Sequence, residues 1–110
     1  MAGWYELTKN ETARFAFVLK AGNNEVILRS EQYESKAAAK NGIVSVQTNS
    51  PNDARYDRKE STSAQPYFNL NASNYQVIGT SQMYASTASR DNGIVSVKTN
   101  GPSTTVKDMT

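Results

Sequence analysis

The sequence predicts an α+β fold in which two similar units pack around one core and are related by a pseudo-two-fold axis. The first observation is a repeat. When the 110-residue sequence is displaced by 51 positions, residues 4–57 align without a gap with residues 55–108, and 22 of the 54 pairs are identical. The second observation is that each copy contains short β-type segments followed by one helical segment. A fixed internal period of this kind indicates a duplicated structural unit.

Three strands are expected at the start of the first copy. WYELTK (4–9) is rich in aromatic residues, RFAFVLK (14–20) alternates apolar and polar side chains, and EVILR (25–29) is rich in β-branched residues. AGNN (21–24) supplies the glycine and asparagine of a tight turn. The second copy repeats this order as RYDRKE, PYFNL and YQVIGT. Its Pro66 opens a strand, where proline is tolerated.

The nearly identical segments NGIVSVQTNSP (41–51) and NGIVSVKTNGP (92–102) are expected to form most of one helix in each copy. Ser35 and Ser86 are suitable N-caps, and the alanine-rich SKAAAK favours a helix over a strand. We therefore predict helices over Ser35–Thr48 and Ser86–Thr99, with Asn49 in the left-handed position that often ends a helix. The alternative is a β-hairpin with its turn at residues 40–43 (KNGI).

Glycine lies inside each predicted helix, at Gly42 and Gly93, and costs about 1 kcal/mol there relative to alanine. Ile43 and Val46 are i, i+3 neighbours that mark the buried stripe of the first helix. A glycine beside this stripe lets the helix backbone lie close to the sheet, so we interpret the repeated segment as a packing surface. The alternative, an anion site at the glycine, is disfavoured because such sites use helix N-termini.

The two copies are expected to form a single domain over residues 1–110, with repeats at 4–54 and 55–108. Half of this chain buries too little apolar surface to be stable alone, so a shared core is expected. Residues 55–57 belong to the end of one copy and to the start of the next, which predicts a shared strand near residues 54–60. Because one chain contains both copies, we expect a monomer.

The composition excludes several classes of function. Cysteine and histidine are absent, which removes disulfides, thiolate nucleophiles, and the commonest general base and metal ligand. The net charge is +2 and is spread evenly over the two halves, so no basic arm predicts an anionic partner. No signal peptide, membrane span or cofactor motif is recognisable. We therefore expect a cytoplasmic protein with no cofactor, no metal and no membrane contact.

These motifs together resemble the YegP-like family, small bacterial tandem-repeat proteins of unknown function. The residues that carry the resemblance are FVLKAGNNEVIL, SEQY, NGIVSV and VIGTSQMY, and the likeness covers residues 3–108. It implies tandem β-β-β-α-β repeats that form an antiparallel sheet with two helices packed on it. It also implies that C-terminal strands are exchanged between the copies. It implies no catalytic residues, cofactor or activity.

One candidate for chemistry is the acidic pair Asp53 and Asp57, with Arg55 and Arg58 interleaved. Acid–base catalysis by paired carboxylates needs one pKa raised by burial. The arginines instead favour the charged carboxylates. We interpret the group as solvated ion pairs, and we do not expect an enzyme.

A second candidate is a mixed aromatic and basic surface on the sheet face away from the helices. Residues that differ between the copies are freer to be exposed, and Trp4, Arg14, Arg55 and Tyr67 are the residues we expect there. We predict a non-catalytic binding or interaction module with an unknown partner. The alternatives are single-stranded nucleic-acid binding through this surface, which the low net charge disfavours, and an enzyme that uses Asp, Tyr or Lys.

Overall fold

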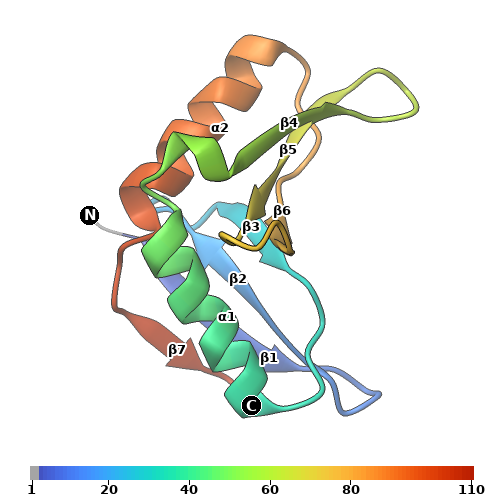
Figure 1. Ribbon diagram of the computed structural model, residues 1–110. Helices are drawn as coiled ribbons and strands as arrows, with labels where there is room; N and C mark the ends of the chain where they lie inside the picture. Colours follow the sequence, from blue (N-terminus) through green and yellow to red (C-terminus); the bar gives the residue numbers. More distant parts are fainter. Residues whose placement is uncertain (1–2) are drawn as a thin grey trace.

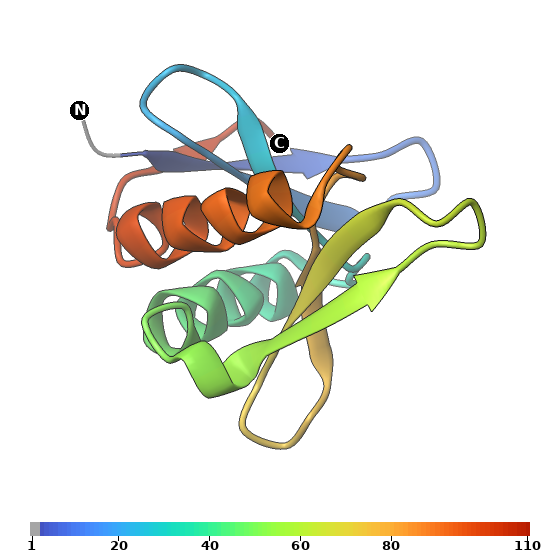
Figure 2. The same ribbon diagram turned by 90° about the horizontal axis from the view of Figure 1, so that it is seen from above.

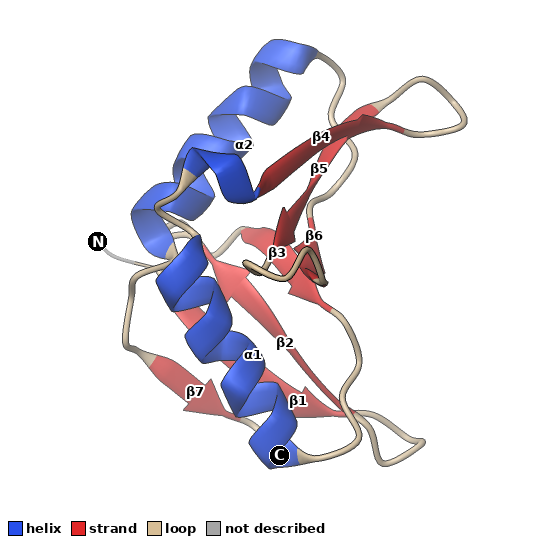
Figure 3. Ribbon diagram, viewed as in Figure 1, coloured by secondary structure: helices blue, strands red, loops and turns tan. Residues whose placement is uncertain are grey.

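The computed structural model describes residues 3–110 and contains seven strands and two helices (Figures 1 and 3). In chain order the elements are β1 (Trp4–Lys9), β2 (Phe15–Lys20), β3 (Val26–Ser30), α1 (Lys36–Asn49), the 3-10 turn η1 (Asp53–Arg55), β4 (Tyr56–Glu60), β5 (Pro66–Asn71), β6 (Val77–Thr80), α2 (Thr87–Asn100) and β7 (Val106–Asp108). The strand and helix segments predicted from the sequence are confirmed to within about two residues at their ends.

The strands form one sheet in the order β4-β5-β6-β3-β2-β1-β7. The two repeats join in its middle, where β3 and β6 pair with Arg29 opposite Thr80. Both helices contact this sheet across the repeat boundary: α1 contacts β2, β5 and β6, and α2 contacts β2, β3 and β5. Figure 2 shows the helices side by side within the bend of the sheet. The predicted single core shared by two repeats is therefore what the structure contains.

The outermost pairing differs from a purely antiparallel sheet. β7, the C-terminal strand of the second repeat, lies parallel to β1 of the first repeat, with Val106 opposite Tyr5. This is the strand exchange that the resemblance implies. At the other edge, β4 pairs with β5 alone, so within residues 3–110 no strand covers its outer side. The pseudo-symmetry is thus broken at the sheet edges.

The two helices begin as predicted, because the side chains of Ser35 and Ser86 accept hydrogen bonds from the backbone N–H groups of Ala38 and Ser89. The hairpin alternative at residues 40–43 is excluded. The predicted left-handed position at Asn49 is wrong: Asn49 is the last helical residue, and the C-cap after it has a right-handed φ of −59°. The cause is local hydrogen bonding, since Asn49 Nδ2 donates to the carbonyl oxygen of Ser45 at 2.8 Å and holds the last turn closed.

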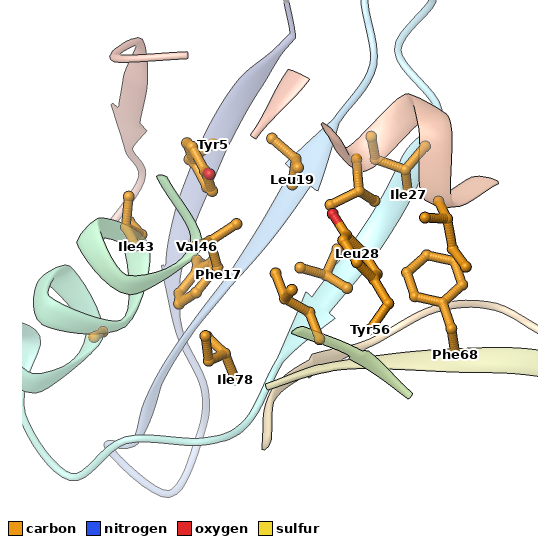
Figure 4. Packing of buried hydrophobic residues seen from close by; sticks show 14 of the residues in the cluster. Tyr5, Phe17, Leu19, Ile27, Leu28, Ile43, Val46, Tyr56, Phe68 and Ile78 are labelled. Carbon is orange, nitrogen blue, oxygen red and sulfur yellow. The ribbon is translucent and has the colours of Figure 1, made fainter. Parts of the chain in front are cut away.

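One apolar cluster fills the space between the sheet and the helices (Figure 4). Within it, Tyr5 meets Phe17 edge-to-face at a ring distance of 5.8 Å, and Tyr56 meets Phe68 at 5.6 Å in the second repeat. These aromatic residues, which are identical in the two copies, are therefore core residues. Within residues 3–110, neither helix has the length and apolar character needed to cross a bilayer.

Two tyrosine hydroxyl groups connect the repeats, because each donates a hydrogen bond to the end of the helix in the other repeat. The Tyr5 hydroxyl donates to the carbonyl oxygen of Gly101 at 2.6 Å, and the Tyr56 hydroxyl donates to that of Ser50 at 2.7 Å. Ser50 and Gly101 are the C-cap residues of α1 and α2, and they lie in contact where the helices converge (Figure 1). The C-cap carbonyl group of each helix is therefore satisfied inside the core.

Candidate ligand-binding site

A cleft of about 340 Å³ lies between α1, the segment before it, and the hairpin formed by β5 and β6. We call it the α1 cleft. It crosses the repeat boundary, because α1 belongs to the first repeat and the hairpin to the second. Its lining consists of Glu31, Tyr33, Ala38, Asn41, Gly42, Ser45, Ala72, Gln76, Val77 and Ile78.

Tyr33 forms the inner wall of the α1 cleft. Its ring stacks on Phe17 with centroids 6.2 Å apart and planes 12° apart. Its hydroxyl lies directly against the backbone of α1 at Gly42, and a Cβ atom added there would lie 2.7 Å from Tyr33 Cζ and overlap the hydroxyl. Burial, with a smaller contribution from the charge of Glu31, raises the pKa of Tyr33. The glycine therefore makes room for this tyrosine, which refines the packing role predicted for the repeated segment.

The polar groups of the α1 cleft come from three elements. Glu31 and Tyr33 precede α1, Asn41 and Ser45 lie one turn apart on α1, and Gln76 ends the turn between β5 and β6. Glu31, Asn41 and Gln76 are exposed, so they contribute little to the core. Lysine and arginine are absent from the lining. The cleft therefore offers hydrogen-bonding groups and one carboxylate, with no basic side chain.

The second repeat places the same kinds of side chain at the corresponding positions, which we call the α2 counterpart. Tyr84 stacks on Phe68 at 6.4 Å and 12° and lies against α2 at Gly93. Burial is the main cause that raises the pKa of Tyr84; the charge of Glu25 also raises it, while a hydrogen bond to Gln82 lowers it. The other members of the α2 counterpart are Asn92 and Ser96.

The acidic and amide residues are exchanged between the two sites. Glu31 of the α1 cleft corresponds to Gln82, and Gln76 corresponds to Glu25. Each site consequently has one glutamate and one glutamine, although neither position has the same residue in both copies. The alignment at a displacement of 51 positions contains this signal, but it is not visible among the identical residues.

The four residues of the predicted aromatic and basic surface are not gathered into one patch. Trp4 and Tyr67 lie on the sheet face away from the helices, but on β1 and β5, four strand spacings or roughly 19 Å apart along the sheet. Arg14 lies in the turn between β1 and β2, at the far end of β1 from Trp4, and Arg55 ends η1. Trp4 itself donates to Glu6 at 2.9 Å and lies 4.5 Å below the ammonium group of Lys107. Ligand binding by these four residues stays a prediction.

The acidic residues near η1 form the surface ion pairs predicted for them. Asp53 accepts from Lys98 at 2.7 Å and from Arg58 at 3.1 Å, and these partners lower its pKa. Asp57 pairs with Lys59 at 3.4 Å. Across residues 3–110, no group of three or more Asp and Glu side chains is placed to hold a metal ion.

A second groove of about 320 Å³ runs between α1 and β7, and we call it the α1–β7 groove. Lys36 and Asp108 form an ion pair between the same two elements, and Gln47 donates to the carbonyl oxygen of Ser103 at 2.9 Å. These contacts join β7 and the segment before it to α1. The α1–β7 groove therefore results from the packing of β7 beside α1. Within residues 3–110, no strand takes the equivalent place beside β4. Its lining is Lys40, Ile43, Val44, Gln47, Val106 and Asp108.

Comparisons with known proteins agree with this architecture. Residues 11–57 and 61–108 each match the model of a domain of unknown function, DUF1508. The chain is 63% identical over its full length to a UPF0339 protein of Shewanella oneidensis, all of which is covered. It is 58% identical over 110 residues to the UPF0339 protein YegP of Escherichia coli O157:H7, again covering all of both chains.

Two solution NMR structures have the same fold. The UPF0339 protein of Shewanella oneidensis superposes with a TM-score of 0.93 at 62% identity, over 99% of this chain and 92% of that one. The Escherichia coli protein yegP, whose function is described as unknown, superposes with a TM-score of 0.94 at 57% identity, over 99% and 94%. The chain therefore belongs to the UPF0339 family, which includes YegP and is built from two DUF1508 domains in tandem.

Proposed function

We propose that this protein is a non-catalytic binding module of the cytoplasm, and that it binds small ligands in the α1 cleft and in the α2 counterpart. The observation that supports this proposal is the exchange of glutamate and glutamine between the two sites. Both sites keep the same set of polar groups, although the individual positions have changed.

Packing alone gives no reason for this exchange. Glu31, Gln76, Glu25 and Gln82 are all exposed, and a surface position of this kind tolerates most polar residues. A ligand that contacts both residues requires one carboxylate and one amide, and it accepts either position as the source of each. One glutamate and one glutamine in each copy are therefore what we expect of a binding site.

The chemistry of the sites favours binding over catalysis. The chain has no histidine or cysteine. Burial raises the pKa of Tyr33 and Tyr84, which moves both phenols further from the near-neutral pKa that a general base needs. The remaining groups in the α1 cleft are amides, a hydroxyl and one carboxylate, which suit hydrogen bonding to a ligand.

The test is a titration of the isotope-labelled protein, followed by backbone amide chemical shifts, with small amines, carboxylic acids, alcohols and amides. At least one class is expected to shift the amide signals of Tyr33, Gly42 and Gln76 together with those of Tyr84 and Gly93. Thr8→Ala, on the opposite face of the sheet, is the matched control and should leave binding unchanged.

An oligothymidylate arm tests the alternative function. Single-stranded nucleic-acid binding predicts salt-dependent shifts near Trp4 and Tyr67 instead of shifts in the α1 cleft. That result, or an absence of shifts in both sites with every ligand class, would overturn the proposal.

A further inference from the structure

We infer that the α1 cleft and the α2 counterpart each bind an alkylammonium group, supplied by a small amine. The inference rests on the proposed binding function and assigns its ligand class. The chain has twelve lysine and arginine residues and a net charge of +2. None of these basic residues occupies a lining position of the α1 cleft or the corresponding position of the α2 counterpart. Each site instead has one glutamate.

Both carboxylates are available to a ligand. Glu31 and Glu25 are exposed, and the ion pairs formed within residues 3–110 use other acidic residues. An anionic ligand would meet this carboxylate with no basic side chain in the lining to offset it. A cationic ligand is attracted by it, so charge complementarity selects a positive group.

The remaining groups fit an ammonium ion. An ammonium group has three N–H donors and no acceptor, so it needs acceptor oxygens around it. The α1 cleft supplies them from the carboxylate of Glu31, the hydroxyls of Tyr33 and Ser45, and the amide oxygens of Asn41 and Gln76.

The apolar part of the lining and the volume of the cleft limit the size and polarity of the part of the ligand attached to the ammonium group. Ala72, Val77 and Ile78 lie on the hairpin side and offer an apolar surface for a short alkyl chain. A volume of about 340 Å³ is near the lower end of the range, roughly 300 Å³ upward, that small-molecule pockets occupy. The fitting ligand is therefore a small amine, and a nucleotide-sized cofactor is too large.

The exchange between the repeats gives a direct test of this charge assignment. Glu31→Gln should weaken amine binding at the α1 cleft about fivefold or more, because a charge-assisted hydrogen bond is lost. It should leave the α2 counterpart unchanged. The double variant E31Q/Q76E gives the α1 cleft the arrangement found in the α2 counterpart, and it should restore binding. Since all of these positions are exposed, the variants should fold.

The experiment is an amide chemical-shift titration with n-butylamine at neutral pH, with 1-butanol and butyrate as controls of similar shape. We expect saturable shifts at Tyr33 and Gly42, and at Tyr84 and Gly93, with n-butylamine only. N-acetyl-lysine methylamide distinguishes a free amine from a lysine side chain of another protein. It should bind no more tightly than n-butylamine.

Three results would overturn the inference. Binding of butanol or butyrate in the α1 cleft without binding of n-butylamine removes the ammonium assignment and leaves the proposed function intact. Failure of E31Q/Q76E to restore binding removes the role of the exchanged carboxylate. Binding of the blocked lysine more than about fivefold tighter than n-butylamine assigns the ammonium group to a protein partner instead. If no ligand of any class shifts either site, the proposed function fails as well.

Discussion

At the scale of single residues, Gly42 and Gly93 lower the stability of their helices, and the structure explains why glycine is nevertheless present. Replacing a helical glycine by alanine normally stabilises a helix by about 1 kcal/mol. Here a Cβ atom at residue 42 would lie 2.7 Å from Tyr33 Cζ and 2.9 Å from Phe17 Cε2, both on rings fixed by stacking. We expect Gly42→Ala to destabilise the fold by about 1–3 kcal/mol, because the two rings cannot move apart without opening the core. Urea unfolding monitored by circular dichroism measures this.

The control for this substitution is Val44→Ala, on the exposed side of the same helix, where the side chain is 56% exposed. It should change stability by less than about 0.5 kcal/mol. The double variant G42A/Y33F should recover part of the loss, since it removes the hydroxyl nearest the new methyl group. A Gly42→Ala protein that is more stable than the wild type would show that Tyr33 moves freely, and would weaken the description of the α1 cleft.

At the scale of elements, the helix ends show what local sequence can predict. The N-caps at Ser35 and Ser86 were predictable because capping depends on residues within one turn. The C-terminal ends were not, because Asn49 closes the last turn of α1 through Ser45, and the carbonyl oxygens of Ser50 and Gly101 are satisfied by tyrosines of the other repeat. Tyr5 lies 96 residues from Gly101, whereas Tyr56 lies 6 residues from Ser50 but belongs to the next repeat. The walls of the α1 cleft likewise come from both repeats, so local patterns could not assemble them.

These tyrosine contacts also predict a pH dependence. Burial is the main cause that raises the pKa of Tyr5 and Tyr56 above the ordinary value of 10.0. In the unfolded chain both phenols ionise near pH 10, whereas in the folded chain they stay protonated. Their contribution is therefore fully present below pH 10 and is lost as the pH rises above it.

The double variant Y5F/Y56F tests this contribution. Each substitution should cost about 1–2 kcal/mol at neutral pH, because a buried carbonyl group of a helix end loses its donor. The decline of stability above pH 10.0 should be shallower than in the wild type. Urea unfolding at pH values on both sides of 10.0 measures both effects, and Tyr75→Phe, on a side chain that is 81% exposed, is the control. Equal slopes in wild type and double variant would contradict the assignment.

At the scale of the whole molecule, the repeat predicted the shared core but not the difference between the two sheet edges. Residues 55–57 align both with the first strand of the first copy and with the C-terminal residues 106–108, which predicted a strand shared by the two copies. In the structure this segment forms the end of η1 and the start of β4. The corresponding C-terminal residues 106–108 form β7 and cover β1. Within residues 3–110, β7 fills the place beside β1 and no separate strand is left for the equivalent place beside β4, so that edge of the sheet stays open. This difference depends on how the strands of both repeats are arranged in one sheet, and no local pattern contains it.

The open edge at β4 carries features that oppose pairing with a second molecule. The backbone N–H of Tyr56 donates to Asp53 of η1, whereas its equivalent Tyr5 donates to Thr105 beside β7. Arg58, which faces the helix side of the sheet like Phe68 opposite it, occupies the place of the buried Leu7 and pairs with Asp53 at 3.1 Å. An inward-pointing charge on an edge strand is a known protection against association of sheets.

We therefore expect the wild-type protein to be a monomer, and Arg58→Leu to associate, because the substitution gives β4 the apolar residue that β7 covers in the first repeat. Sedimentation velocity at low and high protein concentration measures this. Arg58→Lys keeps the charge and should stay monomeric at both concentrations. A wild-type dimer would mean that a second chain covers β4 despite its charges, whereas a monomeric Arg58→Leu variant would assign the protection to η1 alone.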